Sequence, residues 1–464
     1  IFGTLLGITS KYVILFVIFA ALLEAFGAGQ FFIDLAYSVL GRVRGGPAKV
    51  AVIASAFMGT INGVAIANVA ATGTFTIPLM KKTGYQANFA GAVEAVSSCG
   101  GQIMPPIMGA AAFIMADILG MPYIGIVLAA VIPAIVYFAA VYFAVDLEAA
   151  KQGLKGLPKE ELPRVAVVLK KGWYLLIPVA VLLYLLAVMQ SSEMRAVFWS
   201  ILSLIAIDVA HELITRRTFD FRRFLQALEN GAKNSLGVIS ACAAAGIVIG
   251  MVSLTGLGMK LSSLLIALSG GSLPVLLVLT MVASIILGMG LPTTACYVVL
   301  ATLAAPALIE LGVSPLAAHL FVFFFGMIAP ITPPVALAAY VGAGIAQGDP
   351  VKTGFIAFRL GLASFLIPFV FVYSPALLMH GEVGQILWTA FTTLMGVYAL
   401  ASGLEGFGFL PLNYPLRILL IAAAVMLIIP EVFTDILGLV LVVATMLGQL
   451  YYRRQRQVSA QHSS

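Results

Sequence analysis

The sequence predicts an all-helical protein that crosses a membrane many times. Hydrophobic residues make up 62% of its 464 positions, whereas Asp, Glu, Lys and Arg make up 9%, against about 25% in a typical soluble domain. So few charges cannot cover a water-facing surface. Apolar segments also recur along the whole chain. These two observations indicate a polytopic membrane domain and exclude a soluble enzyme or a disordered chain.

A helix needs about 20 apolar residues to cross a bilayer, and on that basis we predict eleven crossings. They lie at about 12–26, 86–117, 123–146, 173–190, 195–212, 235–255, 315–346, 353–378, 384–402, 416–430 and 434–451. Two further apolar stretches, 47–80 and 273–309, are too long for one crossing and have Gly-rich or Pro-containing polar runs at their middle. We expect each to be a re-entrant hairpin that returns to the side it entered from.

The basic residues support this topology, because Lys and Arg accumulate in short cytoplasmic loops. With both hairpins counted as non-crossing, all but three of the 25 lysines and arginines fall on one side, the exceptions being Lys11, Arg195 and Lys260. We therefore expect the N-terminus of this chain outside and its C-terminus in the cytoplasm. The topology also accounts for the net charge of +6 without a nucleic-acid partner.

A pattern of proline and glycine occurs twice. Pro78, Pro105, Pro106 and Pro122 recur 228 positions later as Pro306, Pro333, Pro334 and Pro350. Each copy would cross the membrane three times, so the second copy would be inverted. Inverted repeats with interrupted helices that meet near the midplane are typical of secondary transporters.

We accordingly divide the chain into four parts. They are the first inverted repeat at 1–146 (hairpin 47–80, broken helix 86–117), connecting loops and scaffold helices at 147–234, the second repeat at 235–378 (hairpin 273–309, broken helix 315–346), and C-terminal transmembrane helices with a cytoplasmic tail at 379–464.

Non-helical backbone at membrane depth must face protein or a water-filled cavity, since its amides and carbonyls are otherwise unsatisfied. Four runs predict such backbone: 59–64, 97–106, 288–294 and 326–334. Their carbonyls and Ser, Thr, Asn and Gln oxygens suit a small hard cation such as sodium. The helix N-termini that follow each break would attract an anionic substrate.

Two carboxylates need separate explanations. Glu94 lies on an apolar helix and would either help to bind a cation or proton, or bond structurally to tip amides such as that of Asn62. Glu24 lies near the end of the first span and is expected at the membrane interface. No P-loop, dinucleotide fingerprint or Ser-His-Asp spacing is present, so we expect no enzyme, and no His or Cys cluster indicates a transition metal.

A family resemblance rests on three motifs. The run GTINGVAIANVAATGTFTIPLM at 59–80, AGAVEA at 90–95 and GGQIMPP at 100–106 resemble the large permease of tripartite ATP-independent periplasmic (TRAP) transporters, and most closely the TAXI-type fused permeases. The likeness covers about residues 1–380. The tip sequence 61–64 departs from the Ser-rich tips of many family members, so its ligands could differ.

The resemblance implies a sodium-driven secondary importer of the ion transporter superfamily that works by an elevator motion. It implies a periplasmic binding protein that delivers a carboxylate or other organic acid, and a small membrane subunit or a fused equivalent, in the bacterial inner membrane. The predicted sodium ligands are Thr60, Asn62, Ser97, Ser98, Gly101, Gly288, Thr293, Gly326 and Thr332. The predicted substrate-binding residues are Asn62, Asn68, Thr72, Gln102, Thr293 and Thr294.

Three other functions stay open on sequence alone. The first is a sodium/dicarboxylate carrier of the same superfamily that needs no binding protein. The second is a gated ion channel, and the third is a membrane subunit that assembles with others but transports nothing.

Overall fold

The computed structural model describes residues 3–215, 220–429 and 431–462, and within them the regular structure is helical apart from one isolated bridge between Phe407 and Pro411. Eight of the described helices have the length and composition to cross a membrane. They are Leu5–Ala25, Tyr123–Gln152, Lys159–Val188, Glu193–Ile214, Phe221–Thr255, Pro350–Tyr373, Val383–Glu405 and Val432–Gln455. Each matches one predicted crossing, so the all-α, polytopic class is confirmed.

The three remaining predicted crossings consist of shorter helices. Segment 86–117 forms α6 (Ala87–Gly100) and α7 (Ala110–Leu119). Segment 315–346 forms α17 (Pro315–Ile328) and α18 (Leu337–Ala346). Segment 416–430 forms α22 (Tyr414–Met426), whose 13 residues fall short of the about 20 that a crossing needs.

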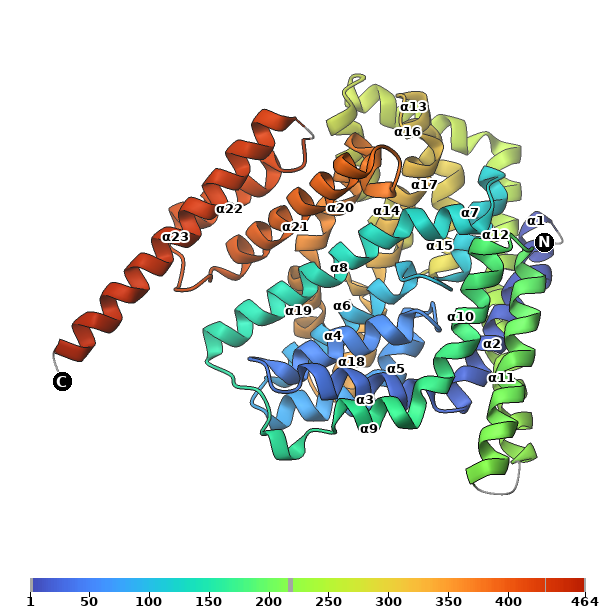
Figure 1. Cartoon of the computed structure of the whole chain (residues 1–464). Helices are drawn as coiled ribbons and strands as arrows, with labels where there is room; N and C mark the ends of the chain where they lie inside the picture. The colour runs from blue at the N-terminus through green and yellow to red at the C-terminus, as the bar shows by residue number, and fades with distance from the viewer. Residues whose placement is uncertain (1–2, 216–219, 430, 463–464) are drawn as a thin grey trace.

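The two long apolar stretches are each interrupted where the sequence predicts. The first contains α4 (Gly46–Gly59) and α5 (Ala65–Lys82), which pack against each other. The second contains α14 (Leu273–Gly288), α15 (Thr293–Leu303) and α16 (Ala305–Glu310). In Figure 1 the pair α4 and α5 lies in the lower part of the view, whereas α16 lies in the upper part.

Proline explains why α6 and α17 end where they do. The residue before a proline is pushed out of the helical region, and proline itself has no amide to continue the hydrogen bonding. Met104 precedes Pro105 and has φ −77° and ψ 117°, and Thr332 precedes Pro333 and has φ −97° and ψ 122°. A 3-10 turn, Gly101–Ile103 or Ala329–Ile331, follows each α-helix, and the helical backbone then stops at the extended residue directly before the Pro-Pro pair.

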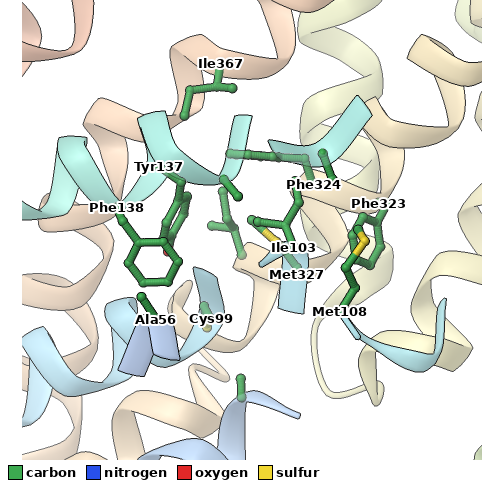
Figure 2. Packing of buried hydrophobic residues seen from close by; sticks show 14 of the residues in the cluster. Ala56, Cys99, Ile103, Met108, Tyr137, Phe138, Phe323, Phe324, Met327 and Ile367 are labelled. Atoms are coloured by element: carbon green, nitrogen blue, oxygen red, sulfur yellow. The ribbon is translucent and has the colours of Figure 1, made fainter. Parts of the chain in front are cut away.

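The broken helices cross at the centre of the molecule. A Cβ atom built on Gly342 of α18 would lie 2.5 Å from the carbonyl oxygen of Gly91 in α6, so the two backbones touch there. Figure 2 shows Ile103 and Met327, at the ends of α6 and α17, next to each other. The ring of Phe324 meets that of Tyr137 edge to face, with ring centroids 6.0 Å apart.

Long helices surround this centre. α2 (Ile14–Ala25) packs against α11 (Glu193–Thr215) and α12 (Phe221–Thr255) at the right of Figure 1. The described chain also contains α3 (Ala28–Leu40), α8 (Tyr123–Gln152), α9 (Val165–Gly172), α10 (Ile177–Leu183), α13 (Leu257–Ser269), α19 (Pro350–Gly361), α20 (Leu366–Tyr373), α21 (Val383–Glu405) and α23 (Val432–His462). α8 and α12 run through the boundaries expected at 146/147 and 234/235. α22 and α23 project away from the body.

Candidate functional site

All four helix breaks line one cavity of about 380 Å³. Residues 61–67, which connect α4 to α5 and begin α5, form one side of it. Residues 290–294, which connect α14 to α15 and begin α15, form another side. The break after α6 adds Gln102 and Met108, and the break after α17 adds Pro330. Segments separated by more than 200 positions in the sequence therefore meet around a single space, which faces α2 and α12 on its other side.

Four helices begin at this cavity. The first residues of α5, α7, α15 and α18 are Ala65, Ala110, Thr293 and Leu337, and all four line it. None of these helices has a side-chain cap. The amide of Ala112 in α7 donates to the carbonyl oxygen of Gly109 at 2.9 Å, and the first amide of each helix is left to bind a ligand. No Lys, Arg or His is among the lining residues. The groups in the lining that attract an anion are therefore backbone amides at helix N-termini, and the carboxyl group of Glu24 opposes them.

Four predicted substrate-binding side chains lie in the cavity lining: Asn62, Gln102, Thr293 and Thr294. Asn62 accepts a hydrogen bond from the amide of Val64 at 3.2 Å. Gln102 is 1% exposed, and its Nε2 reaches the carbonyl oxygen of Met327 at 3.5 Å. Its Oε1 is buried with no partner in the described part of the chain. A buried acceptor without a partner is costly, so this oxygen marks a position where a bound ligand or water would donate.

Most of the predicted sodium ligands lie behind this lining. The hydroxyls of Thr60, Ser97 and Thr332 donate to backbone carbonyls of their own helices, at 2.6, 2.7 and 3.1 Å. A Cβ on Gly59 would lie 2.2 Å from Cα of Gly101, and one on Gly288 would lie 2.9 Å from Cβ of Ala329 and 3.7 Å from Cα of Gly326. In both halves, therefore, a tip packs closely against a break.

Three predicted ligands belong to a separate buried cluster around Glu94, which is fully buried. Glu94 accepts hydrogen bonds from Ser55 at 2.8 Å, from Thr72, and from Ser98 at 3.5 Å. Thr76 donates to its second oxygen. Thr72 and Ser98 thus face Glu94 and not the cavity.

Asn68 completes this cluster. Its side-chain Nδ2 donates to the backbone carbonyl oxygen of Ser55 at 3.0 Å, and its backbone carbonyl oxygen accepts from the Thr72 hydroxyl at 2.8 Å. Of the two explanations that the sequence leaves open for Glu94, the structure supports hydrogen bonding between helices. The partners, however, are hydroxyls on α4, α5 and α6, not the amide of Asn62.

Comparison with known proteins identifies the family of this chain. Residues 6–386 match the family described as "Tripartite ATP-independent periplasmic transporter, DctM component". The chain belongs to this family. This family consists of TRAP transporter large permeases, so the motif resemblance is confirmed as far as the family. The chain is a multi-pass membrane protein.

The permease is similar to several curated TRAP transporter proteins. It is 26% identical to the 2,3-diketo-L-gulonate TRAP transporter large permease protein YiaN of Escherichia coli over 77% of this chain and 83% of that protein. It is 23% identical to the C4-dicarboxylate TRAP transporter large permease protein DctM of Vibrio cholerae over 79% and 86%. It is also 23% identical to the sialic acid TRAP transporter large permease protein SiaM of the same organism over 77% and 81%.

Two polar residues of the permease's cavity were not among the predicted binding residues. Asn234 of α12 lines the cavity, although a segment boundary was expected beside it. Glu24, expected at the membrane interface, lies in the lining at the end of α2. On α2 and directly before it, the lining residues are Val13, Phe16, Val17, Ala20, Ala21 and Glu24. Their helical spacing is visible in the sequence, but it does not distinguish a cavity lining from ordinary helix packing.

The permease offers oxygen ligands only. Within the described ranges no three His, Cys, Asp or Glu side chains lie close enough together to hold a metal ion. The cavity instead presents the side-chain oxygens of Asn62, Gln102, Thr293 and Thr294 beside the backbone of the helix breaks. Such a set can bind a weakly held, hard cation.

Proposed function

We propose that this permease is a sodium-coupled secondary importer of organic acids in the bacterial inner membrane. Substrate would arrive on a periplasmic binding protein, and a small membrane subunit or a fused equivalent would complete the transporter. The observation that carries the proposal is the convergence of four helix breaks, each with a free helix N-terminus, on one cavity without cationic side chains.

A carboxylate is the ligand that these N-termini favour. Free first-turn amides donate hydrogen bonds to anions, and their dipoles add a positive potential that is strong where water is scarce. The relatives whose names give a substrate are named for diketo-L-gulonate, C4-dicarboxylate and sialic acid. An organic acid bound to the tips of both hairpins is therefore the substrate class we propose.

Sodium coupling rests on the oxygen ligands at the breaks. Asn62 and Thr293 lie in the lining and belong to opposite tips. The other predicted ligands would contribute through carbonyls at the breaks that they flank. A bound cation would order both tips and add positive charge beside the carboxylate, so that cation and acid would bind cooperatively.

An elevator motion fits the two walls of the cavity. One wall is made of hairpins and broken helices that pack closely on each other, through contacts such as Gly59 with Gly101. The other wall is made of α2 and α12. We propose that the first wall moves as a unit while the second stays fixed, and that the two halves of the chain are inverted repeats. The helices after residue 386, where the family match ends, are consistent with a fused TAXI-type permease.

The decisive experiment is uptake by proteoliposomes that contain the full transporter. Labelled organic acids are offered with an inward sodium gradient, with and without the cognate binding protein, and we expect uptake only when both are present. Uptake without the binding protein would favour a binding-protein-independent carrier. Uptake that persists when choline replaces sodium would refute the coupling, and flux that never accumulates acid above its outside concentration would favour a channel.

The tips are tested by two substitutions. We expect Asn62→Ala and Thr293→Ala each to raise the sodium concentration for half-maximal uptake about tenfold, since each removes one ligand worth about 1.4 kcal/mol. Thr302→Ala is the matched control, because the Thr302 hydroxyl bonds to carbonyls of its own helix, α15, and is not part of the lining. Unchanged sodium activation in both tip variants would contradict the assignment.

A further inference from the structure

A second hollow lies on the side of the molecule, between α10 with its π-helical extension Tyr184–Val188 and the start of α11. Its volume is about 590 Å³. The lining residues are Val181, Leu185, Met189, Ser191, Arg195, Trp199, Leu202, Ser203 and Ala206. None of them belongs to the transport cavity described above.

The hollow is an elongated groove. On α11 the lining residues Arg195, Trp199, Leu202 and Ala206 follow one another at helical spacing, and the first and last are 11 positions apart, or about 16 Å along the helix. The facing lining residues on the other segment, such as Val181 and Leu185, are four positions apart. A length of about 16 Å corresponds to one half of the about 30 Å hydrocarbon core of a bilayer.

One end of this groove is polar. Arg195 and Ser191 lie at the beginning of α11, where the helix dipole also attracts anions. Arg195 is exposed and forms no ion pair in the part of the chain that the structure describes. The nearby carboxylate of Glu193 accepts from the amide of Tyr123 at 3.4 Å. The guanidinium group is therefore available to an external anion.

The rest of the groove is apolar apart from Ser203, whose hydroxyl donates to the carbonyl oxygen of Ser200 at 2.8 Å. An aromatic side chain lies beside the polar end. Leu185, Leu202 and Ala206 offer only hydrocarbon. Trp199 is 50% exposed, and tryptophan is enriched at the depth of the lipid headgroups. Arg195 is also one of the three basic residues that the predicted topology leaves on the outer side. A charge at headgroup depth and an apolar channel one leaflet long match a single class of ligand.

We infer that this groove binds an anionic glycerophospholipid of the outer leaflet, with its phosphate on Arg195 and one acyl chain along the stripe of α11. Guanidinium binds phosphate through paired, charge-assisted hydrogen bonds. The acyl chain gains contacts with the apolar side chains that line the groove. A zwitterionic lipid satisfies its own phosphate in part with its amine, so the anionic lipid is preferred.

The test uses the fluorescence of Trp199. The chain has three tryptophans, and replacing Trp173 and Trp388 by Phe leaves Trp199 as the reporter. The full chain is reconstituted in phosphatidylcholine vesicles that contain increasing fractions of brominated phosphatidylglycerol or brominated phosphatidylcholine. We expect half-maximal quenching at about a tenfold lower fraction of the brominated phosphatidylglycerol, as one charge-assisted hydrogen bond predicts.

Substitutions then assign the preference to Arg195. We expect Arg195→Gln to make the two quenching curves coincide, and Arg195→Lys to keep part of the difference, because lysine keeps the charge but loses the paired hydrogen bonds. Lys260→Gln, which removes another basic residue of the outer side, is expected to change nothing. Coinciding curves in the parent protein, or equal loss of preference in the Lys and Gln variants, would overturn the headgroup assignment. Absence of quenching by either lipid would mean that protein covers the groove and would overturn the proposal.

Discussion

At the scale of single residues, we expect substitution of Glu94 to lower the stability of the permease strongly. It is fully buried, and the described donors to its carboxyl group are hydroxyls on three helices. We expect Glu94→Ala to destabilise the permease by about 3–5 kcal/mol, because it leaves buried hydroxyls without their acceptor and opens a cavity. The unfolding midpoint of the purified protein in detergent measures this change.

Two further variants separate the role of the acceptor from the role of the charge. Glu94→Gln keeps the shape and one acceptor oxygen, so we expect a loss smaller than that of Glu94→Ala. Glu229→Ala is the matched control, since Glu229 is exposed on α12 and pairs with Lys233 one turn away; exposed pairs of this kind contribute little to stability. A midpoint for Glu94→Ala equal to that of the control would contradict the structural role of Glu94.

At the scale of elements, the tip of α4 and α5 depends on glycine at two contacts. A Cβ on Gly59 would lie 2.2 Å from Cα of Gly101, and one on Gly63 would lie 1.9 Å from the carbonyl oxygen of Met108. Both neighbours are backbone atoms of the break after α6, which cannot move aside as a flexible side chain does. The tip can therefore lie this close to the broken helix because Gly59 and Gly63 have no side chain.

We expect Gly63→Ala to abolish uptake, because an added methyl group must push the tip away from Met108 and distort the cavity. The overpacking would cost about 1–3 kcal/mol. Gly250→Ala on α12 is the control, because nothing lies within 4 Å of its Cβ position and alanine favours the helix by about 1 kcal/mol. Uptake by Gly63→Ala that equals uptake by Gly250→Ala would show that the tip contact is dispensable.

At the scale of the whole molecule, the C-terminal helices are separate from the site. The cavity is lined by residues 13–337, whereas α22 and α23 lie beyond the family match and project from the body. We expect a chain without residues 414–464 to insert in the membrane and retain uptake, with at most a fall in expression. Normal membrane levels without uptake would show instead that these helices take part in transport.

The sequence predicted the breaks of the fold more accurately than the roles of individual residues. Pro105 and Pro333 set the ends of α6 and α17 through local rules that need no tertiary contact. Thr72 and Thr293, in contrast, are similar polar residues on helices after a tip. One faces Glu94 and the other lines the cavity, and only the packing of the neighbouring helices decides between these positions.

The amino-acid sequence by itself determined that this chain is a helical membrane protein, where its helices break, and which family it belongs to. The first two properties follow from composition, from the period of apolar residues and from proline and glycine, all of which act locally. The family rests on the motifs and on the match over residues 6–386. The tertiary structure decided that the four breaks share one cavity, that Asn234 and Glu24 face it, and that Asn68, Thr72 and Ser98 do not. These outcomes depend on how helices far apart in the chain pack. A polar side chain of a given type can bind a ligand where it faces a cavity, and donates to a neighbouring helix where it faces that helix.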